Sequence, residues 1–134
     1  VNYMSGGRFY GRTSGEPGQD ALGDTVDEMH GGVFHGGPDR DVVGDLHDGR
    51  FVGGRGFDIV RFQHGGIYLG QRGNDRVRIM SGGRFKGGSS ADRVVREMSG
   101  GVFNGGPGTD LVRGYSAGQL FSVELCEKPK TVCP

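Results

Sequence analysis

Aspartate recurs at a nearly constant spacing along most of the chain. The six residues lie 17, 17, 17, 17 and 18 positions apart, at Asp24, Asp41, Asp58, Asp75, Asp92 and Asp110. Carboxylate oxygens are the ligands that hard cations such as Ca²⁺ prefer. Carboxylates stacked in a line repel one another unless a counter-charge lies nearby. The spacing therefore predicts an aspartate row that needs a neutralising partner.

Arginine offers a second way to neutralise the aspartate row. Five arginines lie within three residues of an aspartate, at Arg40, Arg55, Arg72, Arg76 and Arg93. Guanidinium groups pair well with carboxylates. Two alternatives therefore stay open, a row that binds calcium and a metal-free row of Asp–Arg pairs. Neither predicts an enzyme, because acid–base catalysis needs two carboxylates in different environments and this row repeats a single one.

Three histidines form a second regular series. His30, His47 and His64 are also 17 residues apart, and other repeats carry serine at the same position, namely Ser5, Ser81, Ser99 and Ser116. We expect a surface row of three imidazoles. Such a row could hold a transition metal as a weak second metal site, or sense pH. The plainer interpretation is a turn position where any small polar side chain suffices.

These residues belong to a repeat of about 17 residues. An aromatic column reads Phe34, Phe51, Tyr68, Phe85 and Phe103, then Leu120, and a valine column reads Val26, Val43, Val60, Val77, Val94 and Val112. A third column reads Met29, Leu46, Gln63, Met80, Met98 and Tyr115. Glycine pairs separate short apolar stretches, and no segment keeps a 3.6-residue period. The pattern predicts an all-β parallel β-roll or β-solenoid with coils of about 17 residues, stacked roughly 4.8 Å apart.

The loops before each aspartate resemble a known repeat. They read G-G-P-D-R-D, G-G-R-G-F-D, G-Q-R-G-N-D, G-G-S-S-A-D and G-G-P-G-T-D, and the stretches 53–60 and 105–112 match G-G-x-G-x-D-x-U-x fully. This resembles the RTX-type (hemolysin-type) calcium-binding repeats. The resemblance implies calcium between successive loops, held by the six aspartates and by loop carbonyls at Gly36, Gly53 and Gly105. Asp20 competes with Asp24 for the first position.

Composition restricts the class of partner. The 134 residues contain 16 basic and 16 acidic side chains, so no net field favours nucleic acid or an anionic membrane. No apolar run approaches the roughly 18 residues of a membrane span. Thirty glycines are unusual for a packed fold and must be demanded by the backbone. We expect neither nucleic-acid binding nor membrane insertion.

The two ends of the chain differ from the repeat. We expect the solenoid to span residues 1–120, with an extra loop of eight residues within 10–25, and a C-terminal cap strand and tail over 121–134. Phe121, Val123 and Leu125 would share one side of that strand. Cys126 and Cys133 suggest a local disulfide rather than free thiols or half of a metal site, and hence an oxidising compartment. The start at Val1 suggests a processed form or an excised fragment.

Together these patterns predict an extracellular, non-catalytic, calcium-binding solenoid with a structural or adhesive role. The alternative is a metal-free solenoid that binds a surface or glycan ligand through one flat face, or that forms a fibre subunit. Self-association through the solenoid ends is expected where a terminal coil leaves its backbone unpaired.

Overall fold

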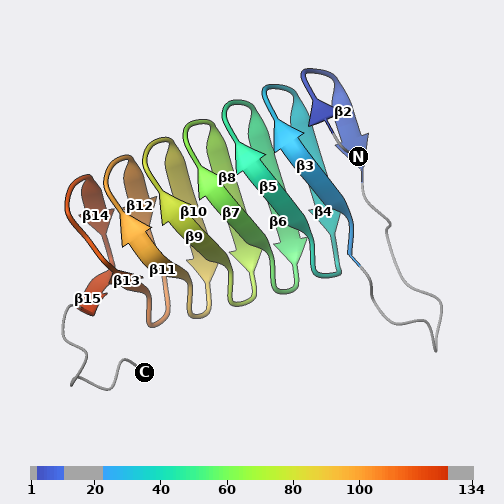
Figure 1. Ribbon diagram of the computed structural model, residues 1–134. Coiled ribbons are helices and arrows are strands. Elements are labelled where there is room, and N and C mark those ends of the chain that lie inside the picture. Colours follow the sequence, from blue (N-terminus) through green and yellow to red (C-terminus); the bar gives the residue numbers. More distant parts are fainter. Residues whose placement is uncertain (1–2, 11–22, 127–134) are drawn as a thin grey trace.

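The computed structural model describes residues 3–10 and 23–126, with side chains through Val123, and shows a parallel β-solenoid (Figure 1). Two sheets run along it. The valine sheet contains β1 (Tyr3–Met4), β3 (Thr25–Met29), β5 (Val42–Leu46), β7 (Ile59–Gln63), β9 (Arg76–Met80), β11 (Arg93–Met98), β13 (Leu111–Arg113) and β15 (Glu124–Cys126). The aromatic sheet contains β2 (Arg8–Tyr10), β4 (Val33–Gly37), β6 (Arg50–Arg55), β8 (Ile67–Arg72), β10 (Arg84–Ser89), β12 (Val102–Asn104) and β14 (Gln119–Phe121). Among the described residues no helix is long and apolar enough to cross a membrane.

Strands of one sheet pair in register with the equivalent strands of neighbouring coils. Val43 lies opposite Val26 and Val60, and Phe51 lies opposite Phe34 and Tyr68. The one 18-residue coil is accommodated by a bulge in β11, between Val94 and Glu97. The predicted solenoid with coils of about 17 residues is confirmed.

The apolar part of the interior is built from the three predicted columns. The members of the valine column from Val26 to Val112 and of the aromatic column from Phe34 to Phe103 are at most 1% exposed. Neighbouring rings from Phe34 to Phe103 stack with centroids 4.6 to 5.0 Å apart and planes within 12°. In-register pairing places like side chains at the strand spacing, so identical rings stack. Gln63 is the polar member of the third column, and its Nε2 atom donates to the Arg84 carbonyl at 2.8 Å.

Glycine is required where turns of adjacent coils meet. At Gly49 φ is 94°, and a Cβ there would lie 2.7 Å from the Gly32 carbonyl oxygen of the preceding coil. At Gly66 φ is 69°, and a Cβ would lie 2.8 Å from the Gly49 oxygen. The left-handed backbone conformation and the close approach of the neighbouring coil both exclude a side chain at Gly49 and at Gly66.

The C-terminal end differs from the single strand that we expected. Phe121 ends β14 in the aromatic sheet, and Ser122, with φ of 53°, turns the chain before β15 begins at Glu124. β15 pairs in parallel with β13, so this segment continues the valine sheet. Residues 11–22 of the expected extra loop, including Asp20, fall outside the described residues, and so does Cys133, so the loop and the disulfide stay predictions.

Candidate metal sites

The aspartate row lies inside the solenoid. Each aspartate precedes a strand of the valine sheet and stands two residues before its valine, so alternation turns both side chains inward. Asp24, at the start of the row, is half-buried. The other five are at most 1% exposed, at Asp41, Asp58, Asp75, Asp92 and Asp110. The turns of this row follow the strands of the aromatic sheet, along the lower edge in Figure 1.

One oxygen of each buried aspartate binds the backbone of the preceding coil. The N–H of Asp24 donates to Oδ1 of Asp41 at 2.7 Å, and the N–H of Asp41 donates to Oδ1 of Asp58 at 2.8 Å. The same bond repeats at 2.8 to 3.0 Å up to Asp110. The partner of Oδ1 is therefore a backbone amide, where the metal-free alternative expected an arginine. A short side chain turned inward meets this amide, whereas the guanidinium groups of Arg40 and Arg76 lie over the Phe57 ring, 5.4 and 4.7 Å from its centroid.

The second oxygen of each buried aspartate has no hydrogen-bond partner. All five Oδ2 atoms are buried, and each lies against the glycine five residues earlier, at the point that a Cβ of that glycine would occupy. At Gly36 this point is also 2.8 Å from the Gly53 carbonyl oxygen, and at Gly70 it is 2.7 Å from the Gly87 oxygen. Glycine thus leaves a small cradle where a free carboxylate oxygen and a carbonyl oxygen meet.

The predicted loop glycines Gly36, Gly53 and Gly105 all lie beside this row of oxygens. Gly70 and Gly87 do the same and were missing from the predicted site. The sequence did contain a signal for Gly70 and Gly87, because every buried aspartate of the row has a glycine five residues before it. The sequence motif drew attention to the aspartates rather than to the surface against which they pack.

Burial makes these carboxylates weak acids. Loss of hydration raises the pKa of Asp41 to about 6, of Asp58 and Asp92 to about 7 and of Asp75 to about 8. The backbone hydrogen bond to each carboxylate lowers its pKa but does not cancel the effect of burial. Asp75 is further affected by the charges of Asp58 and Asp92 on either side. A charged row is therefore costly near neutral pH.

The donors fit a hard divalent cation. Unpaired carboxylate oxygens and glycine carbonyls are the ligands that calcium takes, and Oδ2 is the oxygen still free on each of Asp41, Asp58, Asp75, Asp92 and Asp110. Because these side chains are closed to solvent, a cation would enter as the loops close, so that its binding would be coupled to folding.

The histidine row forms on the opposite turn edge. The rings of His30 and His47 stack at 4.3 Å and those of His47 and His64 at 4.8 Å, with planes within 14°. This confirms the predicted surface row of three imidazoles. Ser81 continues it, with Oγ 3.4 Å from Nδ1 of His64. His35 stands apart and stacks on Tyr10 in the aromatic sheet, with centroids 4.8 Å apart.

Two carboxylates beside the histidine row were missed from the sequence. Glu28 Oε2 lies 3.1 Å from Nε2 of His30, and Asp45 Oδ1 lies 3.6 Å from Nε2 of His64. Both occupy one register position on β3 and β5. The period of 17 from Glu28 to Asp45 was a usable signal, but the next two strands place Phe62 and Ile79 there before Glu97 takes the position in β11.

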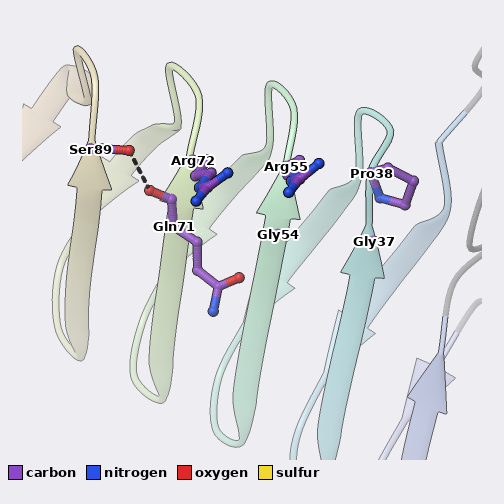
Figure 2. Close-up of a pocket in the computed structure, with 7 residues that line it drawn as sticks. All are labelled: Gly37, Pro38, Gly54, Arg55, Gln71, Arg72 and Ser89. Carbon is purple, nitrogen blue, oxygen red and sulfur yellow. Dashed lines mark hydrogen bonds between the residues drawn. The ribbon is translucent and has the colours of Figure 1, made fainter.

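An open groove lies along the edge of the aromatic sheet (Figure 2). It measures about 700 Å³ and is lined by Gly37, Pro38, Gly54, Arg55, Gln71, Arg72 and Ser89. Arg55 pairs in register with Arg72, and the figure shows both side chains standing on one edge of adjacent coils. Ser89 Oγ donates to the Gln71 carbonyl at 3.3 Å. The side chains of this groove offer cations and no nucleophile–base pair.

Comparisons with protein-family models, with curated proteins and with solved structures give no match, so the likeness of the loops to RTX-type repeats stays a resemblance of sequence motif.

Proposed function

We propose that this chain is a non-catalytic structural β-solenoid whose aspartate row is completed by calcium. The observation that carries the proposal is the line of five buried Oδ2 atoms without a hydrogen-bond partner. A buried, unpaired carboxylate is strongly unfavourable unless it is neutralised. The fold repeats this unfavourable burial in five successive coils, once at each buried aspartate.

Protons and cations can each neutralise the row. Protons do so at mildly acidic pH, because burial raises the pKa of Asp41, Asp58, Asp75 and Asp92 to about 6 to 8. Above that range a divalent cation is the remaining source of positive charge inside the loops. Calcium binds extracellular modules with dissociation constants of roughly 0.1 to 1 mM. We therefore assign the protein to an extracellular setting, where calcium at such concentrations is present.

The role that follows is mechanical. A cation held by loops of successive coils would tie each coil to the next and stiffen the rod. A stiff solenoid with flat sides and pairing-competent ends suits a structural or adhesive element that self-associates through its ends.

Thermal unfolding at about pH 8, with and without millimolar calcium, tests the proposal. Calcium should raise the melting temperature of the wild-type chain, and EDTA should reverse the effect. The double variant Asp58→Asn/Asp75→Asn should lose most of the response. Asp27→Asn, on the exposed outer side of β3, is the matched control and should keep it. If calcium changes nothing and stability follows pH alone, protons complete the row and calcium does not.

A second candidate function, binding of an anionic surface or glycan ligand, is favoured by the paired Arg55 and Arg72 in the groove of Figure 2. Ser89 occupies the same register position in the next coil, so the fold already accommodates serine there. The test variant is therefore Arg55→Ser/Arg72→Ser. Loss of retention on a sulfated polysaccharide column by this variant would support the function. Equal retention of wild type and variant would contradict it.

A further inference from the structure

We propose that the turn edge opposite the aspartate row holds a divalent transition-metal site centred on His47. Three imidazoles and two carboxylates converge there in two overlapping groups. One group consists of Glu28, His30 and His47, and the other of Asp45, His47 and His64. In each group one ligand atom from every residue lies within 4.8 Å of the others.

The solenoid itself brings these ligands together. The imidazoles are held in one row by in-register pairing of β3, β5 and β7. The Tyr3 ring packs against His30 at the N-terminal end of the row, with centroids 4.9 Å apart and planes tilted by 30°. Glu28 and Asp45 stand two residues before a histidine, on the same outer side of their strands. The carboxylates therefore flank the imidazoles without any loop having to bend toward them.

Two coils carry a histidine and a carboxylate two residues before it, namely Glu28 with His30 and Asp45 with His47. The next coils place Phe62 and Ile79 at the carboxylate position, and Glu97 follows them beside Ser99. Each group therefore takes its carboxylate from a coil that also supplies one of its imidazoles.

The chemistry of the donors selects the metal. Two imidazole nitrogens and one carboxylate oxygen form a three-ligand set that leaves one position open, which suits Zn²⁺. Calcium prefers oxygen ligands alone and would not choose this set. Zinc–nitrogen bonds are about 2.0–2.1 Å long, so the ligand atoms of one group must move closer together than the present distances of up to 4.8 Å. The side chains of His47 and His64 are exposed and can rotate to bring their nitrogens to the ion. Since both groups use His47, we expect one ion per chain.

A bound ion would clamp neighbouring coils. His30, His47 and His64 belong to three successive coils, so either group joins two of them across the stack. Metal binding to the folded chain alone raises its stability by mass action. A metal ion at this site would therefore hold together the coils of His30, His47 and His64 at the turn edge opposite the aspartate row.

Isothermal titration of the untagged full chain with Zn²⁺ alone, at about pH 7.5 in calcium-free buffer, tests the site. Imidazole must be neutral to bind, which sets this choice of pH. We expect saturable binding and a higher melting temperature. His47→Ser removes the ligand that both groups share and places the residue of other coils there. Its affinity should be at least about tenfold weaker, since even outer-sphere partners of a metal contribute 10–100-fold.

Two further variants make the result specific. His35→Ser removes the histidine that stacks on Tyr10, away from the row, and should bind zinc as the wild type does. Ser81→His extends the row by one coil and should strengthen binding. Asp58→Asn/Asp75→Asn should keep the zinc response while it loses any calcium response, which separates this site from the proposed function. Equal zinc binding by the wild type and His47→Ser, or no binding by either, would overturn the proposal.

Discussion

The backbone N–H of Asp41 donates to Oδ1 of Asp58, 2.8 Å away and one coil further along the rod. The valine sheet already joins these coils through its own backbone bonds, as at Ile59 N–H to the Asp41 carbonyl at 2.9 Å. The carboxylate therefore extends the hydrogen bonding between the two coils one residue beyond the strand, into the turn. Its Oδ2 atom is left buried and unpaired as a consequence.

Asp58 gives the first prediction, because its two oxygens do different things. In Asp58→Ala the Asp41 amide loses its acceptor inside the protein, which should lower the free energy of unfolding by roughly 1–3 kcal/mol. Asp58→Asn keeps an Oδ1 acceptor and removes the charge. In calcium-free urea unfolding at about pH 8 it should be at least as stable as the wild type. An asparagine variant as unstable as the alanine variant would show that the negative charge itself is needed.

The pH dependence of stability is the second prediction. An unfolded aspartate has a pKa of 3.8, whereas burial raises the pKa of folded Asp58 to about 7 and of Asp75 to about 8. The folded chain then binds more protons than the unfolded chain, so stability falls as pH rises and levels off above the folded values. Without calcium the chain should unfold at lower urea at pH 9 than at pH 5. Asp58→Asn/Asp75→Asn should show a smaller difference, and an equal difference in both proteins would contradict the assignment to this row.

Gly53 gives the third prediction, through the cradle that holds Oδ2. A Cβ at Gly53 would collide with the Asp58 carboxylate, whereas a Cβ at Gly6 would meet nothing within 4 Å. Overpacking of this kind typically costs about 1–3 kcal/mol, and displacing a buried carboxylate adds to it. Gly53→Ala should therefore lower the melting temperature clearly and Gly6→Ala should not. Similar melting temperatures for the two variants would mean that the loops of residues 53–58 yield freely.

Much of the fold could be predicted from the sequence, because in-register stacking translates a period directly into columns. The 17-residue spacing from Phe51 to Tyr68 predicted the coil length. The separate aromatic and valine columns, to which Tyr68 and Val60 belong, predicted two sheets and the residues that each turns inward. Less of the candidate site could be predicted. A spacing of 17 aligns the aspartates, but it does not say that Asp58 turns inward or that an amide one coil away takes its oxygen. Glu28 escaped notice for a related reason, since Phe62 and Ile79 interrupt its column and its proximity to His47 arises from the strand pairing.

The aromatic column is the subject of the fourth prediction. The Phe51 ring is fully buried and stacks on Phe34 at 5.0 Å and on Tyr68 at 4.9 Å. Phe51→Ala should cost about 3–5 kcal/mol, since both neighbours lose a packing surface. Phe62→Ala is the control, because Phe62 is 36% exposed on the outer side of β7. Urea unfolding should separate the two variants by at least about 2 kcal/mol, and a smaller separation would contradict the assigned core.

Tyr68 gives the last prediction, because it is the one phenol in a column of phenyl rings. Its hydroxyl is buried without a hydrogen-bond partner, and burial, together with the charges of Asp75 and Asp58, raises the pKa of this phenol well above its usual value. Tyr68→Phe removes an unsatisfied polar atom and keeps the stacked ring. It should therefore unfold at equal or higher urea, by up to about 1–3 kcal/mol, the usual cost of such an atom.

The calcium-bound state sharpens this test of Tyr68. Neutralising the aspartates removes their charges but leaves the hydroxyl without a partner, so the gain from Tyr68→Phe should persist with calcium and at low pH. Phe85→Tyr, one coil further along, is the reverse change and should be destabilising, since its ring is 1% exposed and stacks 4.6 Å from Tyr68. A loss of stability in Tyr68→Phe would instead mean that the hydroxyl binds a partner, such as an internal water molecule shared with the free Oδ2 atoms.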